Sequence, residues 1–108
     1  MSNEEAQLAL DELRLAIDQI DLRILALFNE RAHIVSGIGD IKKQMTMPIY
    51  EPKREEEVFR NVIGGNRGPL SEGAVRRLFE RIIDEMRTLQ RERMARDTST
   101  LRTKENPQ

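Results

Sequence analysis

The sequence contains no cysteine and no tryptophan, and only 4% of its 108 residues are aromatic. Without cysteine, neither a disulfide framework nor a thiolate metal site can form, which suits a reducing compartment. The formal net charge of -1 gives no bulk field to attract nucleic acid or anionic lipid. No apolar run approaches the ~20 residues of a membrane-spanning helix, and the acidic start at residues 1–5 is unlike a signal peptide. We therefore expect a soluble, cytoplasmic protein that binds neither nucleic acid nor membrane.

The residues that are present favour a small helical domain with a thin core. Hydrophobic residues make up 38% of the chain and charged residues 34%, with many leucines, isoleucines, arginines and glutamates. These residue types are good helix formers. Domains of this size are often marginally stable alone, so we expect the chain to form an oligomer.

The first long segment, from about Glu5 to about Met45, contains no proline and is expected to be one helix. A helix of ~40 residues spans roughly 60 Å, which is more than the width of a globule of this size. Its own chain cannot cover it, so a partner must. Apolar residues recur on it at spacings of three, four or seven, which is a heptad-type seam: Leu13, Ile17, Ile20, Ile24, Leu27, Ile34, Ile38 and Ile41.

Proline and glycine divide the rest of the chain into two further helices. Pro48 ends the first helix, and Pro52 suits the first position of the second. Residues 64–69 form a loop, and Ser71 is a plausible N-cap for a third helix that ends near Arg93. The sequence thus predicts an all-α fold with a long, a short and a longer C-terminal helix over residues 1–95, followed by a polar, disordered tail over residues 96–108.

The apolar stripes of these helices are interrupted by polar residues. Arg31 occupies the seam of the first helix, and Lys42 lies three turns further on and only ~20° away around the axis. Glu55 lies on the stripe that Val58, Phe59, Val62 and Ile63 form in the second helix, and Gln90 on the inward face of the third. An unpaired polar group in a core costs several kcal/mol. These four residues form either an internal network, such as Arg31 with Glu55 and Gln90 with a backbone carbonyl, or a pocket for an anion.

Arg14 gives a geometric constraint on any shared ligand. It lies seventeen residues before Arg31 on the same helix, which is ~25 Å along the axis and on a different side. One small ligand cannot touch both residues of one chain, so an Arg14 that binds it must come from a second protomer. His33, the only histidine, lies off the seam, and a lone histidine makes no zinc site. We expect no metal and no cofactor.

The ordered set of segments over about residues 8–91 resembles the all-helical chorismate mutases. The residues that carry this resemblance are Leu13-Arg14, residues 17–21, residues 25–31, Gly39-Asp40-Ile41-Lys42, residues 48–55, and Leu78-Phe79 through Ile82-Ile83 to Gln90. The resemblance implies an intertwined homodimer of three-helix chains with two equivalent active sites. It implies rearrangement of chorismate to prephenate, in phenylalanine and tyrosine biosynthesis, without a cofactor.

The resemblance also implies a role for each matching position. Lys42 and Gln90 would contact the ether oxygen of the substrate, and Arg31 together with Arg14 of the other protomer would bind its carboxylates. Glu55 would hold the substrate hydroxyl, with Arg54 and Glu51 beside it. Met86 departs from the pattern, because some family members have a small hydroxyl residue there. Methionine donates no hydrogen bond, so that contact is lost, or is made by a backbone group or by Arg87.

Two alternatives stay open from the sequence. An isochorismate pyruvate lyase on the same fold would use much the same cationic pocket. A non-catalytic helical dimerisation or regulatory module would have a pocket closed by internal ion pairs. Association with another aromatic-pathway enzyme is compatible with either activity, and so is regulation by aromatic amino acids or prephenate.

Overall fold

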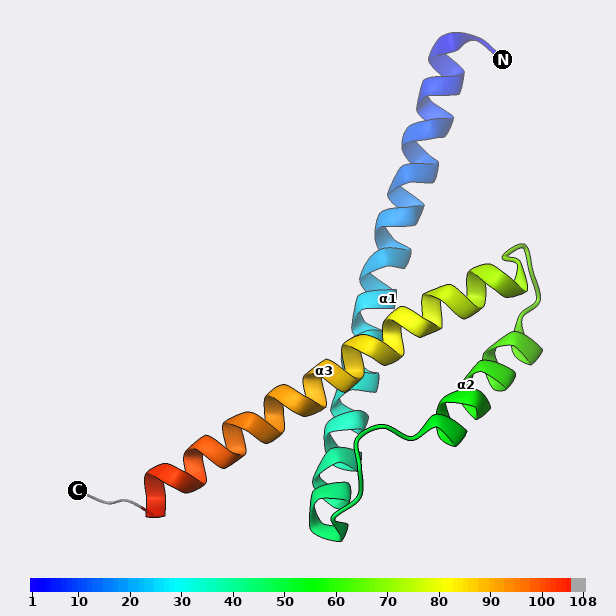
Figure 1. The fold of residues 1–108 in the computed structure, drawn as a ribbon. Helices are drawn as coiled ribbons and strands as arrows, with labels where there is room; N and C mark the ends of the chain where they lie inside the picture. The colour runs from blue at the N-terminus through cyan, green and yellow to red at the C-terminus, as the bar shows by residue number, and fades with distance from the viewer. Residues whose placement is uncertain (106–108) are drawn as a thin grey trace. The chain divides into compact units, whose positions relative to one another are not determined.

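The computed structural model describes the backbone of residues 1–105 and the side chains of residues 1–96, and these form three helices (Figure 1). α1 spans Asn3–Met45, α2 spans Pro52–Gly65 and α3 spans Glu72–Glu105. No strand occurs in this described part, and none of its helices is both long and apolar enough to cross a membrane. The predicted all-α class and the order of a long, a short and a long helix are confirmed.

Both ends of α1 follow from local hydrogen bonding. At the start, the Ser2 hydroxyl accepts a hydrogen bond from the Glu5 backbone N–H at 3.1 Å and donates one to the Glu5 carboxylate. At the end, the Met47 N–H donates to the Lys42 carbonyl at 2.8 Å and the Thr46 N–H to the Lys43 carbonyl at 3.3 Å. Thr46 adopts φ 58, so this is a left-handed helix termination of the Schellman type. It turns the chain back immediately after the last turn of α1.

α2 and α3 form an antiparallel hairpin, in which α2 lies beside the N-terminal half of α3 (Figure 1). Pro52 is the first residue of α2, as predicted from its fixed φ. The connecting loop contains Gly68 at φ 80, in the left-handed region that favours glycine. The Ser71 hydroxyl then accepts a hydrogen bond from the Ala74 N–H at 3.1 Å, so Ser71 is the N-cap predicted for α3.

The core of this hairpin is thin. Among the described side chains the buried hydrophobic ones are Phe59, Val75 and Ile83, each 6–7% exposed, and none is fully buried. The Arg76 guanidinium lies 4.3 Å from the centre of the Phe59 ring and pairs with Glu56 at 3.2 Å, which joins α3 to α2. The thin core expected from the composition is confirmed.

The apolar seam of α1 is exposed within the single chain. The chain divides into two compact units, one of residues 1–34 and one that begins at Val35. In the first unit the exposed fraction ranges from 40% at Ile24 to 64% at Leu13, and in the second Ile38 and Ile41 are 45% and 58% exposed. Leu78, predicted on the buried face of α3, is 54% exposed. A helix cannot cover its own apolar stripe, and α2 lies along only part of α3.

The predicted end of the third helix is wrong. The sequence pattern indicates an end near Arg93 and a disordered tail over residues 96–108, but α3 continues through Glu105. Good helix formers such as Arg, Met, Ala, Leu and Lys in this stretch satisfy their backbone hydrogen bonds locally, without an apolar face to guide the pattern. Residues 106–108, the last part of that tail, lie outside the described residues.

Replacement of Thr46 by glycine should stabilise the protein. A β-branched residue at φ 58 is strained, and relief of that strain in Thr46→Gly should raise the free energy of unfolding by about 1 kcal/mol. Gln44→Gly, two residues earlier and still helical, should lower it by about 0.5 kcal/mol, because glycine is a poor residue in a helix interior. Urea denaturation measures both, and a loss of stability in Thr46→Gly would show that the left-handed turn is not formed.

Candidate active site

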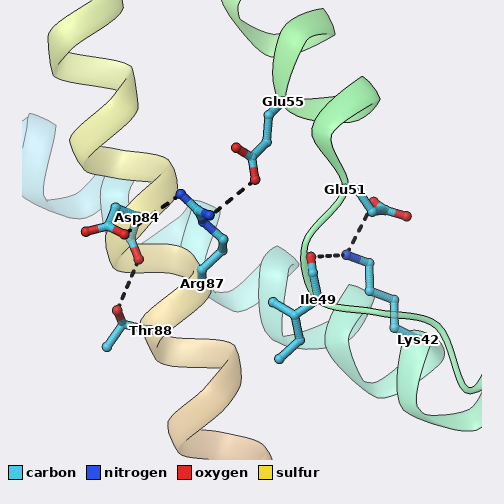
Figure 2. A network of polar contacts seen from close by, with 7 residues as sticks. All are labelled: Lys42, Ile49, Glu51, Glu55, Asp84, Arg87 and Thr88. Carbon is cyan, nitrogen blue, oxygen red and sulfur yellow. Dashed lines mark hydrogen bonds and ion pairs between the residues drawn. The ribbon is translucent and has the colours of Figure 1, made fainter.

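Lys42 is the buried cation of the structure's second unit. Its side chain is 8% exposed, and it leaves α1 on the inward face predicted from the helical phase. The ammonium donates a hydrogen bond to the Ile49 carbonyl at 3.0 Å and lies 3.3 Å from a Glu51 carboxylate oxygen (Figure 2). An ammonium group can donate three hydrogen bonds, and these contacts use two of them.

The residues that hold Lys42 come from the connector between α1 and α2. Since the left-handed turn at Thr46 reverses the chain, residues 46–51 pass back beside the end of α1 and bring Ile49 and Glu51 to the ammonium. Removing one partner from a buried ion pair costs about 3–5 kcal/mol. Glu51 is 33% exposed at its side chain, so its own share is smaller than that. The connector therefore fixes the position of the positive charge.

Gln90 is the second buried polar side chain, at 7% exposure. Its amide nitrogen donates to the Val35 carbonyl at 3.4 Å, a long hydrogen bond that joins α3 to α1. The Gln90 side chain packs over Gly39, where an added Cβ would lie 3.6 Å from it. Gly39 precedes Lys42 by three residues, about one helical turn. The amide and the ammonium thus occupy adjacent turns on one face of α1.

Glu55 faces a cation from α3. A carboxylate oxygen of Glu55, on α2, lies 3.7 Å from the Nε of Arg87, and both side chains are largely shielded, at 20% and 26% exposure (Figure 2). Arg87 is also 3.8 Å from Asp84 on its own helix. Glu55 therefore lies on the inward side, as its phase predicts, and it belongs to an ion pair between two helices.

A second cross-helix ion pair fixes α1 against α3 near Gln90. Arg93 donates to both oxygens of Asp40, at 3.3 and 3.1 Å, which is a bidentate arrangement. Both side chains are about half exposed, so screening by water limits the contribution to stability. The forked geometry nevertheless sets the register between the Gly39–Lys42 turn and the Gln90 turn.

Arg54 and Met86 are placed less centrally. Arg54 is 60% exposed and pairs with Glu57 at 3.0 Å on its own helix. With Tyr50, Glu51 and neighbouring residues it lines an open hollow of about 610 Å³ at the N-terminal end of α2. Met86 is half-buried on α3, between the positions of Ile83 and Gln90.

Arg14 and Arg31 belong to the N-terminal unit and are described on their own. Arg14 is exposed, whereas Arg31 is half-buried. Both are on α1, and their separation of seventeen residues corresponds to ~25 Å along the axis. Their role beside the residues of the second unit is therefore part of the proposal below.

The structure brings together partners that the sequence did not identify. The phase of each helix indicates that Lys42, Glu55 and Gln90 point inward, but not that the Ile49 carbonyl and the Val35 carbonyl serve as acceptors. Arg87 was considered only as a substitute beside Met86. Its spacing of three residues before Gln90, about one turn, is a signal that could have placed it on the same side of α3.

Chemically, this arrangement suits an anionic ligand with a polar oxygen. A desolvated ammonium and a primary amide are hydrogen-bond donors, and donors held in place stabilise an oxygen that gains negative charge. A carboxylate such as Glu55 accepts a hydroxyl. Among the described residues, no group of three or more histidines and acidic residues is placed to hold a metal ion.

Comparison with protein families gives one match over most of the chain. The family model described as chorismate mutase type II matches residues 13–91. This range contains the predicted site residues from Arg14 to Gln90. The match therefore spans both the candidate site and the three helices that form it.

Individual relatives agree with this match. Over 86 residues the chain is 42% identical to a bifunctional chorismate mutase/prephenate dehydratase of Neisseria gonorrhoeae, a match that covers 76% of this chain and 23% of that protein. It is 38% identical over 53 residues to a chorismate mutase of Methanocaldococcus jannaschii, which covers 49% of this chain and 54% of that protein. A chorismate mutase structure from Thermus thermophilus superposes with a TM-score of 0.75 at 32% identity, over 77% of this chain and 94% of that one.

The contact between Gly39 and Gln90 predicts a size limit at position 39. Gly39→Ala should raise the free energy of unfolding by about 0.5–1 kcal/mol, because alanine favours the helix and its Cβ would meet Gln90 at an ordinary 3.6 Å. Gly39→Val should lower it by about 1–3 kcal/mol, because the added methyl groups displace the Gln90 side chain.

Thermal unfolding and the Gln90 side-chain amide resonances measure both effects. Gly39→Ala is the matched control, since it tests the helix without filling the space of Gln90. Equal stability of the two variants, with unmoved Gln90 resonances, would contradict the packing of Gln90 on Gly39.

Proposed function

The chain belongs to the type II chorismate mutase family, and we propose that it is an isomerase that converts chorismate to prephenate, a step of phenylalanine and tyrosine biosynthesis. The observation that carries this proposal is the pair of buried donors, Lys42 and Gln90, on adjacent turns of the α1–α3 contact. The chain corresponds to 23% of the length of its bifunctional relative from Neisseria gonorrhoeae. The activity therefore concerns the matched domain.

The reaction requires restraint and charge stabilisation, but no proton transfer. In a [3,3] rearrangement the C–O ether bond breaks while a C–C bond forms within the same molecule. A site that holds the enolpyruvyl side chain over the ring lowers the entropic part of the barrier. Lys42 has donor capacity for a third acceptor, and with the Gln90 amide it would stabilise the ether oxygen as negative charge develops there. This chemistry needs no nucleophile and no cofactor.

The remaining candidate residues would bind the ends of the substrate. Arg31 and Arg14 of the second subunit suit the two carboxylates, because guanidinium groups form forked, charge-assisted bonds with them. Glu55 would accept the ring hydroxyl. Glu51 would hold Lys42 in place and, with Arg54, border the site at the start of α2.

We propose that the functional form is a homodimer. Six seam residues of the first unit are 40–64% exposed, and covering them would contribute on the order of 5–10 kcal/mol before the entropic cost of association. A second copy offers the same seam in return, as a two-fold interface requires. It also solves the distance problem, because it supplies an Arg14 that the same chain cannot bring to the ligand of Arg31.

A non-catalytic regulatory module is the second candidate. The ion pairs Lys42–Glu51 and Glu55–Arg87 satisfy much of the polar interior without a ligand, as this alternative expects. A lyase acting on isochorismate remains a third. Association with another aromatic-pathway enzyme is compatible with the fused domain organisation named for the relative from Neisseria gonorrhoeae, and the cytoplasmic location stays a prediction from sequence.

Turnover of purified protein distinguishes these candidates. With chorismate as substrate, we expect loss of its absorbance with formation of prephenate, and with isochorismate no formation of salicylate. Salicylate formation would replace the mutase by the lyase. An absence of turnover with both substrates would favour the regulatory module.

Lys42→Ala should abolish this activity while the dimer persists. Loss of a charged donor at the breaking bond should lower kcat/KM by at least about 10³. Lys43→Ala removes the same charge from the exposed neighbouring position and should change kcat/KM by less than about threefold. Sedimentation shows whether both variants remain dimeric, and near-normal turnover of Lys42→Ala would exclude Lys42 from the chemistry.

Subunit mixing tests the shared site. Arg14→Ala and Lys42→Ala should each be inactive, but a heterodimer of the two has one site in which both residues are intact. About a quarter of wild-type specific activity should return when equal amounts exchange freely, as random pairing gives half heterodimers with one working site of two. Mass spectrometry under native conditions confirms the exchange. No recovery after confirmed exchange would exclude a site built from two chains.

A further inference from the structure

Arg87 is the cation of the interior for which the proposed function has no task. It extends from α3 towards Glu55 on α2, with its Nε 3.7 Å from the Glu55 carboxylate (Figure 2). The guanidinium also lies 5.4 Å from the centre of the Tyr50 ring in the connector, and 3.8 Å from Asp84. Arg87 is therefore flanked by α2, the connector and its own helix.

The Nε of Arg87 is buried and has no hydrogen-bond partner. A buried N–H without a partner is unfavourable, so the position of this group is set by the charges and the ring around it. At 3.7 Å the contact with Glu55 lies beyond hydrogen-bond distance but within ion-pair range. The positive charge thus faces the carboxylate without occupying an acceptor lone pair on it.

We propose that Arg87 is a positioning residue for Glu55, holding its carboxylate ionised and oriented while leaving it free to accept a ligand hydroxyl. This role rests on the proposed function, in which Glu55 accepts the ring hydroxyl of the substrate. Asp84 braces the guanidinium from the preceding turn of α3, and Tyr50 limits its movement towards the connector. Arg87 thereby couples the spacing of α2 and α3 to the geometry of substrate binding.

The contact predicts which substitutions are tolerated. A single guanidinium nitrogen faces Glu55, rather than a bidentate fork, so a lysine ammonium can supply the same charge. Arg87→Met keeps the length of the aliphatic chain and removes the charge. We expect Arg87→Met to raise KM about tenfold and to change kcat less than about threefold, whereas Arg87→Lys stays within about threefold of wild type in both.

Arg76→Met is the matched control. Arg76 also joins α3 to α2, through Glu56 at 3.2 Å, but it is eleven residues from Arg87 and does not contact Glu55. If Arg87 served only to hold the two helices together, Arg76→Met would raise KM as much. We expect unchanged KM in Arg76→Met, with circular dichroism and sedimentation confirming that all variants are folded and have the same mass.

A double-mutant cycle with Glu55→Gln shows whether Arg87 acts through Glu55. If it does, Arg87→Met should raise KM less than about twofold in the Glu55→Gln background, because the carboxylate that it positions is gone. Multiplicative effects, an equal rise in Arg76→Met, a main effect on kcat, or an Arg87→Lys no better than Arg87→Met would each overturn the proposal.

Wild-type turnover separates this test from that of the proposed function. If wild type rearranges chorismate, the cycle decides the role of Arg87 alone. If wild type does not, the proposed function fails first, and the ¹³C resonance of the Glu55 carboxyl still tests the contact. That resonance should shift in Arg87→Met and stay unchanged in Arg76→Met, and an unshifted resonance in both would overturn the positioning of Glu55.

Discussion

The ammonium group of Lys42 lies in the interior of a thin helical core, and its charge has to be balanced within a few ångströms. At 8% exposure water contributes little, so the Glu51 carboxylate and the Ile49 carbonyl do this. They reach the ammonium because α1 ends in a left-handed turn at Thr46, which returns the connector along the helix. The end of α1, the path of the connector and the start of α2 at Pro52 are thus parts of one solution to a single buried charge.

The thin core has a second consequence. Phe59, Val75 and Ile83 are the buried hydrophobic residues of the described side chains, while large apolar residues remain exposed along α1. Under the proposed function, a second subunit covers that surface and also delivers Arg14 to the site. Stability and catalysis would then depend on the same association. The polar interior, which weakens a single chain as a folding unit, becomes the binding pocket of the dimer.

Much of the fold could be predicted from the sequence, because the signals are local. Proline at position 52 and the N-cap at Ser71 act over a few residues, and helical phase placed Lys42, Glu55 and Gln90 inward. The partners of these side chains were missed: long side chains such as Arg87 choose among neighbours that only the packing of three elements defines. The alternative pairing of Gln90 with a backbone carbonyl is present, at Val35. The continuation of α3 to Glu105 was missed because it has no apolar face.

The central claim is that one ligand is bound by residues of two chains around Lys42, and a crystal structure with a stable dicarboxylate analogue of the rearranging substrate tests it most directly. We expect the ether-type oxygen of the analogue within hydrogen-bond distance of Lys42 and Gln90. Its carboxylates should lie on Arg31 of one subunit and Arg14 of the partner subunit. An analogue bound away from Lys42, or held by one chain alone, would contradict the shared site.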